Sequence, residues 1–259
     1  MNRSQWNRFV KARERFREEV GELARSLPKL KGIQQKLADN RTGGKNSSYT
    51  VETPVVYNSA LDGFTINDEI KLILVADNPG RREQAAENRR YLVGPSGKIA
   101  NKFFRDNPSL GIDFLKNVII LNKTPIHSPR TVELRELCRM EAQMGGGAIS
   151  SAMEIAHALE ESQKKMAALL LEFHEALDSP VWIIGYSEMK KGGIFEVYTE
   201  SLKELYSKRQ EMFKHIYFYR HFSMNQFTID LKQQSLPGET LTKSLRRIGT
   251  AYRKRILNF

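Results

Sequence analysis

Hydrophobic residues follow two kinds of spacing along the chain, and each kind predicts a different element. Four short uninterrupted apolar runs occupy residues 72–76, 118–121, 181–184 and 216–219. Runs of this length, closed by polar residues or glycine, are typical of strands buried on both faces of a sheet. We therefore predict four interior strands.

Helical spacings of three, four and seven residues fill much of the remaining chain. They cover residues 4–27, 151–177, 198–205 and 240–256. The stretch 39–49 is rich in turn-forming residues and has no periodicity, so we expect an exposed loop there. Strands separated by helices favour an α/β fold, a three-layer α/β/α sandwich around a central four-stranded parallel sheet.

Length and composition restrict the class of protein. With 259 residues and 40% hydrophobic residues, we expect one globular domain over 1–259. It would comprise a basic helix and loop at 1–50, a core at 70–230 and a basic helix at 240–259. No apolar run is long enough to cross a membrane and no signal peptide is evident, so we expect a cytoplasmic protein without a membrane partner.

The cysteine count excludes several kinds of site. Cys138 is the only cysteine, so the chain cannot form an internal disulfide, a thiolate metal cage or an iron–sulfur site. We expect no metal, no cofactor and a monomer.

The net charge of 41 − 30 = +11 is concentrated at the two ends of the chain. Residues 1–50 carry 12 basic and 5 acidic residues, and residues 240–259 carry 6 basic residues and no acidic one. Two basic arms around a nearly neutral body would suit the phosphates of a nucleic acid. The alternative is that both arms are ordinary solvated helix faces.

Polar residues follow three of the four predicted strands. They are Asp77-Asn78-Pro79-Gly80, Asn122 and His221-Phe222-Ser223. Ligands of open parallel sheets bind outside the carboxyl ends of the strands, so these side chains should share one rim. Together they could read a planar polar ligand, position a water and stabilise negative charge. The alternative is a set of turn formers with one structural histidine.

These clusters, with YLVGPSG at 91–97, resemble the motifs of the uracil-DNA glycosylase superfamily in order and approximate spacing. Family 4 members have G-E-A-P-G followed by P-F-V-G-x-A-G, and ADNPG at 76–80 corresponds to the first of these. Asn78-Pro79-Gly80 is closer to the G-I-N-P-G of mismatch-specific members. The resemblance covers roughly 70–230. It implies hydrolytic removal of uracil, or a related damaged base, from DNA by base flipping.

The resemblance also implies roles for individual residues. Asn78 would hold the attacking water, Asp77 would supply negative charge near the sugar, and His221 would stabilise charge on the leaving base. Asn122 would hydrogen-bond the Watson–Crick edge of the base. The other substrate-pocket candidates are Pro79, Gly80, Tyr91, Leu92 and Ser223, and those for DNA contact are Gly94, Ser96, Met224 and Gln226, with Phe227 as a further wedge candidate.

The chain departs from the family pattern at several positions. The cluster-binding cysteines are absent, Phe222 replaces a proline and Ala76 replaces a glycine. Leu92 replaces a stacking phenylalanine, whose role the neighbouring Tyr91 could take over. Three alternatives stay open. The protein is an enzyme for uracil or another base, a catalytically inactive relative that binds nucleic acid, or a protein that holds a free nucleotide-like molecule.

Overall fold

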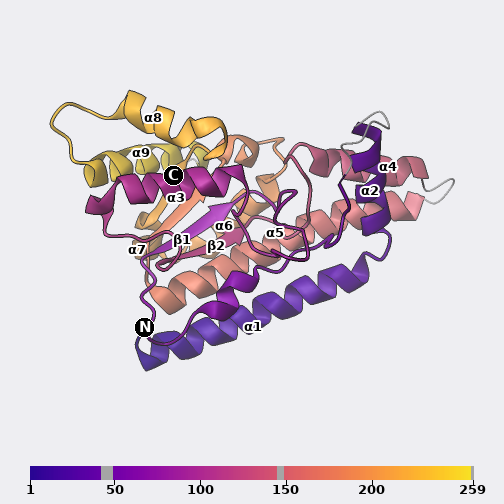
Figure 1. Ribbon diagram of the computed structural model, residues 1–259, viewed down its shortest axis with the longest axis horizontal. Coiled ribbons are helices and arrows are strands. Elements are labelled where there is room, and N and C mark those ends of the chain that lie inside the picture. The colour runs from indigo at the N-terminus through magenta and orange to yellow at the C-terminus, as the bar shows by residue number, and fades with distance from the viewer. Residues whose placement is uncertain (42–48, 145–148, 258–259) are drawn as a thin grey trace.

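The protein is an α/β sandwich built on one parallel sheet (Figure 1). The computed structural model describes residues 1–41, 49–144 and 149–257. The strand order is β2-β1-β3-β4, and all neighbouring pairs are parallel. The four predicted strands and the predicted fold class are confirmed. The bounds are β1 Leu72–Ala76, β2 Val118–Asn122, β3 Val181–Ile184 and β4 Ile216–Tyr219.

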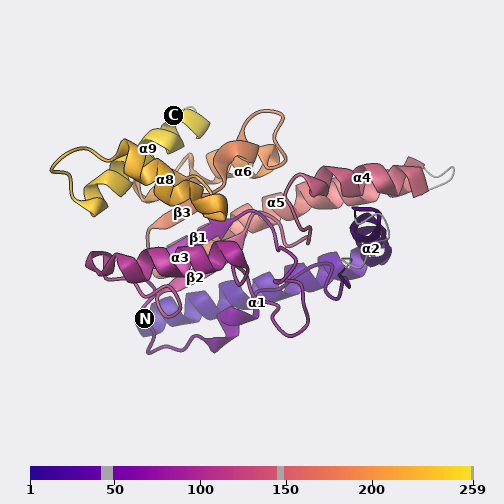
Figure 2. The ribbon, with the colours of Figure 1, turned by 45° about the horizontal axis from the view of Figure 1, so that its top comes forward.

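Helical layers cover both faces of the sheet, which explains why the strands are continuously apolar. Helices α3, α8 and α9 lie on one face (Figures 1 and 2). Helix α5 lies on the other, with α1 and α6 packed against it. The helix bounds are α1 Arg3–Ser26, α2 Leu30–Arg41, α3 Pro95–Asp106, α4 Glu133–Met144, α5 Ile149–Leu177, α6 Glu196–Tyr206, α7 Gln210–Lys214, α8 Gln226–Gln234 and α9 Leu241–Leu257.

Four short 3₁₀ turns complete the described secondary structure. Three of them belong to loops that build or support the site described below. Their bounds are η1 Ser59–Gly63, η2 Pro108–Leu110, η3 Tyr186–Met189 and η4 Ser223–Asn225.

The expected loop at 39–49 is partly wrong. Helix α2 extends to Arg41, and residues 42–48 lie outside the described residues. The apolar positions of α2, including Leu30, Ile33 and Leu37, do have helical spacing, but over too few turns to stand out beside the polar stretch. Helix α5 begins two residues before the predicted start.

The sheet changes direction between β1 and β3. From β1 the chain passes through α3 to β2 on one side, whereas β3 and β4 lie on the other side of β1. In open parallel sheets the loops diverge at such a switch point and leave a crevice outside the carboxyl ends of the strands. The register places Ala76 level with Asn122, so the β1 and β2 ends lie at one edge.

A single hydrophobic core connects the elements of the described chain, from Phe9 in α1 to Leu257 in α9. Among the described residues, none of the helices is both long and apolar enough to span a membrane.

Candidate functional site

A cavity of about 890 Å³ opens at the carboxyl edge of the sheet. Its walls come from the loops that follow all four strands, from the start of α3 and from the last turn of α9. Most of the candidate site residues line it, so the sequence correctly groups them in space. They are Asp77, Asn78, Gly80, Leu92, Ser96, His221, Ser223, Met224 and Gln226.

Asn122 lies next to this cavity but is not part of its lining. It is 1% exposed at the last position of β2, level with the lining residue Ala76. Among the described residues, neither polar atom of its amide has a hydrogen-bond partner. Buried amides without partners are rare and costly, so the side chain is a candidate for contact with a ligand that reaches past the cavity wall.

Three other candidates are supporting residues of the cavity rather than lining residues. Tyr91 is buried, donates its hydroxyl to the Val56 carbonyl at 2.6 Å and packs against Phe16, so its ring faces away from a stacking position. Pro79 is buried and uses its carbonyl as an acceptor, and Gly94 is the N-cap residue of α3.

Asp77 is held by partners that the sequence did not predict. Its Oδ1 lies 2.5 Å from the Lys123 ammonium and its Oδ2 accepts from the Thr131 hydroxyl at 3.1 Å. Lys123 is 0% exposed and also donates to the Ile184 carbonyl at 2.6 Å. Burial lowers the pKa of Lys123, whereas Asp77 raises it. The Asp77 carboxylate is therefore neutralised and fixed in position.

Asn78 is oriented through its amide nitrogen. Nδ2 donates to the Ser128 carbonyl at 3.0 Å and to the Ser128 hydroxyl at 2.9 Å. Ser128 is itself fixed, because its backbone N–H donates to the Pro79 carbonyl at 3.2 Å. The amide nitrogen is thus committed to protein partners, and Oδ1 remains to accept a hydrogen bond from a water or ligand.

His221 lines the cavity, and one of its ring nitrogens is bonded to the backbone. Its Nδ1 accepts the backbone N–H of Ser223 at 3.0 Å, which places the proton of a neutral ring on Nε2. Burial lowers the pKa of His221, an effect that nearby Lys123 strengthens and Asp77 opposes. The ring is therefore neutral at physiological pH and offers one N–H.

The segment after His221 carries one exposed apolar side chain at the cavity rim. Met224 is 77% exposed, and it and Asn225 adopt positive φ angles of 51° and 58°. Such angles are uncommon outside glycine, so the tight turn holds Met224 outward. Phe227 does not share this position, because it is buried and stacks on Phe222 with ring centroids 4.4 Å apart.

Glu83 is a cavity-lining carboxyl that sequence reasoning missed. It is 8% exposed, and its Oε2 accepts the Gly80 N–H at 3.0 Å. It also bonds the Leu92 backbone. Burial raises the pKa of Glu83 to about 7, against the lowering effect of these two bonds. Glu83 therefore links the turn after β1 to the opposite wall at Leu92.

Leu92 is a strained and closely held wall residue. Its φ of 52° is a genuine outlier for a bulky side chain. A Cβ at position 97 would lie 1.4 Å from the Leu92 carbonyl oxygen, so only glycine lets the first turn of α3 pack there. Strain held in place by neighbours is typical of ligand clamps.

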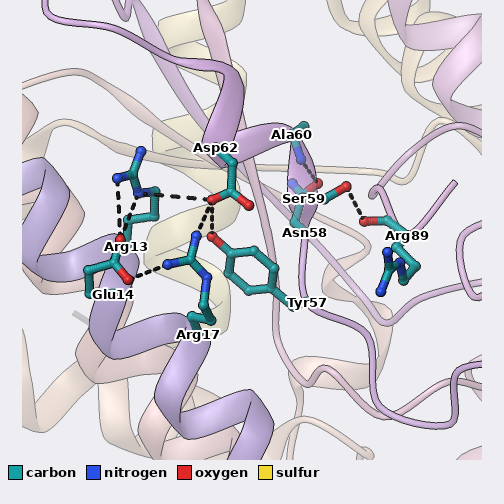
Figure 3. Close-up of polar contacts among 9 residues, drawn as sticks. All are labelled: Arg13, Glu14, Arg17, Tyr57, Asn58, Ser59, Ala60, Asp62 and Arg89. Atoms are coloured by element: carbon teal, nitrogen blue, oxygen red, sulfur yellow. Dashed lines mark hydrogen bonds and ion pairs between the residues drawn. The ribbon is translucent and has the colours of Figure 1, made fainter.

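A polar network fixes the loop that carries Leu92, and Figure 3 shows part of it. The Asn58 side chain donates to the Ile120 carbonyl in β2 at 2.8 Å and accepts the Tyr91 N–H at 3.2 Å. Ser59 contributes its hydroxyl, which donates to the Arg89 carbonyl at 3.0 Å. The sheet edge and the cavity wall are thus connected through one buried asparagine.

The segment before β1 that contains Asn58 is tied to α1 through Arg13 and Arg17, which are both paired (Figure 3). Asp62 accepts from Arg17 at 2.6 Å and from the Tyr57 hydroxyl at 2.7 Å, and Glu14 pairs with both Arg13 and Arg17. No residue of α1 lines the cavity in the part of the chain that is described. The basic residues of α1 therefore do not lie next to the site, where phosphate contact by this arm would be needed.

Two of the missed residues had a sequence signal. Lys123 directly follows a buried strand, and Glu83 lies three residues after Gly80. Each position is close to a motif that was identified. The ionic partner of Lys123 and the burial of Glu83, however, depend on contacts between distant segments.

The chain matches no protein-family model, no curated protein and no solved structure. The likeness to uracil-DNA glycosylases therefore depends on the sequence motifs alone, and the residue roles stay predictions. Within the described ranges, no group of three or more His, Cys, Asp or Glu side chains is placed to hold a metal ion.

Proposed function

We propose that this protein hydrolyses the N-glycosidic bond of uracil, or of a related damaged base, in DNA. The observation that carries the proposal is the placement of His221. It lines the same cavity as Asn78 and Leu92, and no protein partner of its Nε2–H is present among the described residues. A duplex base cannot reach such a cavity, so the target nucleotide has to be everted into it.

The reaction leaves positive charge on the sugar and negative charge on the departing base. Water adds to C1′, the bond to the base nitrogen breaks, and the base leaves with the electron pair and takes up the proton that the water loses. His221 donates a hydrogen bond to the base as negative charge develops, an interaction that is stronger in the transition state than in the ground state. Asn78 Oδ1 orients the attacking water.

The remaining residues bind the base or fill the space that it leaves in the stack. Leu92 forms an apolar wall for the base. The side-chain amide of Asn122, which has no hydrogen-bond partner among the described residues, is matched to a base with both donors and acceptors on its edge. Met224 fills the gap that the everted base leaves in the stack. Asp77 acts as a fixed acceptor whose position Lys123 determines.

The principal alternative is a catalytically inactive relative that binds nucleic acid. The Lys123–Asp77 ion pair favours it, because a neutralised carboxylate stabilises positive charge on a sugar less strongly. The third hypothesis, a holder of free nucleotides, draws on the cavity volume of about 890 Å³, which suits a ligand larger than a single base.

Release of uracil from a labelled oligonucleotide separates these alternatives. The proposal predicts release that falls about 100- to 1,000-fold in His221→Ala and Asn78→Ala. His157→Ala is the matched control, because His157 is an exposed histidine outside the cavity lining. DNA binding without release would support the inactive relative. Weak and nearly salt-independent DNA binding would support the free-nucleotide hypothesis.

A further inference from the structure

Three side chains on the β3–β4 side of the cavity have no part in the proposed chemistry. Tyr186 lies in η3 after β3, Arg220 directly follows β4, and Arg255 lies in the last turn of α9. All three line the cavity, although they come from distant parts of the sequence. They form what we call the arginine cluster.

Arg255 is held by two aromatic rings. Its guanidinium carbon lies 4.8 Å from the ring centroid of Tyr252 and 5.5 Å from that of Tyr186. It also donates to the Tyr186 hydroxyl at 3.1 Å. Within the described residues no carboxylate forms an ion pair with Arg255, so its charge is oriented but not neutralised.

Arg220 is oriented by an acidic residue that has another partner. Its Nε donates to Asp230 Oδ1 at 3.2 Å, and Asp230 also accepts the Tyr252 hydroxyl at 2.8 Å. Asp230 is buried, while the Arg220 side chain is 50% exposed. The guanidinium is held by Asp230 and by a hydrogen bond to the Tyr252 side chain, and its exposed N–H groups are left for a ligand. The two arginines of the cluster and their partner Asp230 together leave a net charge of 2 − 1 = +1.

The chemistry of the arginine cluster suits a phosphodiester group. A guanidinium presents paired donors that match the oxygens of phosphate, and an oriented one loses less conformational freedom on binding. Tyr186 adds a hydroxyl at the same rim. Arg130 also lines the cavity, but its Nε is paired with the buried Glu133 at 2.7 Å.

We propose that Tyr186, Arg220 and Arg255 bind a backbone phosphate of DNA next to the nucleotide that enters the cavity. The choice of DNA rests on the proposed function, and the phosphate site itself rests on the cluster. The base then lies toward Leu92 and the backbone toward α9, which gives the ligand one orientation across the sheet. The same phosphate chemistry occurs in a free nucleotide, so the test includes both.

The experiment measures binding of the full chain to a short duplex at several salt concentrations. The duplex carries one 2′-fluoro-deoxyuridine, which resists cleavage of the bond to the base. Arg255→Gln and Arg220→Gln are each expected to weaken binding about tenfold. Each is also expected to reduce the slope of log K against log salt by about one. Arg246→Gln is the matched control, because Arg246 is exposed on the same helix outside the cavity lining.

A second variant and a second ligand keep the outcomes separate. Arg255→Lys keeps the charge but loses the paired donors, so its affinity should fall while the salt slope stays unchanged. Unchanged slopes in both glutamine variants, with melting temperatures preserved, would overturn the proposal. The proposal would also be overturned if the variants lost binding of deoxyuridine monophosphate but kept binding of DNA. Base release is measured separately, so failure of catalysis with intact slope changes would reject the proposed function and keep the phosphate site.

Discussion

The two sides of the cavity are built in opposite ways. After β1 and β2, most of the polar groups are buried or half-buried and bonded to protein partners: Asp77 to Lys123, Asn78 to Ser128, and Glu83 to the Gly80 backbone. After β3 and β4, the two arginines of the arginine cluster are oriented but open to solvent, and Tyr186 beneath them is buried. The first side suits recognition of an uncharged base, and the second suits attraction of a charged backbone. Substitutions on the first side should therefore cost stability and rate, and those on the second should cost affinity and salt dependence.

The largest effect on stability is expected at the buried ion pair. Asp77→Asn leaves the Lys123 ammonium buried without its counter-charge, which should lower the free energy of unfolding by about 3–5 kcal/mol. Chemical denaturation measures it. Asp106→Asn is the control, because Asp106 forms an exposed pair with Lys102 and its loss should change stability far less. Equal losses in the two variants would contradict the buried role of Asp77.

The second effect concerns pH and Glu83. The pKa of this carboxyl is about 7 in the folded protein, against 4.5 ordinarily, so the folded state holds the proton more tightly than the unfolded state between these values. The contribution of Glu83 to stability is therefore present below pH 4.5 and is lost as the pH rises to 7.

Glu83→Gln should remove this pH dependence. Between about pH 4.5 and 8, the free energy of unfolding of the variant should rise relative to the unaltered protein by up to about 3 kcal/mol. Denaturation at a series of pH values measures the difference. Parallel curves for the two proteins would show that Glu83 is not the group responsible.

The open side should respond through binding. The double variant Arg220→Gln with Arg255→Gln is expected to weaken DNA binding on the order of 100-fold, with a change in unfolding free energy below about 1 kcal/mol. Fluorescence anisotropy and denaturation give the two values. A large loss of stability would show that the arginine cluster supports the fold, as the residues after β1 and β2 do.

The smallest effect is expected in α1. Arg13 and Arg17 are paired with Glu14 and Asp62 and lie outside the cavity lining (Figure 3). Arg13→Gln with Arg17→Gln should leave DNA affinity within about twofold, since paired surface charges contribute little. A salt slope that falls as much as in the arginine cluster variants would instead assign α1 to the DNA interface.

The sequence predicts the sheet well because the four strands are buried on both faces. A continuous apolar run such as 72–76, too short for a buried helix, fits the interior of a sheet, and parallel strands bring Asn78 and His221 to one edge. The local pattern says less about which charged residues form ion pairs. The charge surplus of residues 1–50 fits either phosphate contact or a solvated helix face, and the pairing of Arg13 and Arg17 depends in part on Asp62, a residue from a different segment.

Individual side-chain directions were the least predictable feature. Tyr91 was a stacking candidate, but its hydroxyl finds a partner in the Val56 carbonyl and its ring is taken into the core. Arg255 belongs to a helix recognised from its periodicity, but only tertiary packing brings its last turn to the cavity. Such contacts join residues far apart in sequence, so spacing alone does not reveal them.

The most direct test compares His221→Ala with Arg255→Gln in single-turnover release of uracil at saturating DNA. We predict that His221→Ala stays at least about 100-fold slow at saturation, because it lacks the donor to the leaving base. Arg255→Gln should regain the rate of the unaltered protein once DNA saturates, because it lacks only a binding contact. Absence of release by the unaltered protein, or an equal loss of rate in both variants at saturation, would contradict the proposed roles of the two residues.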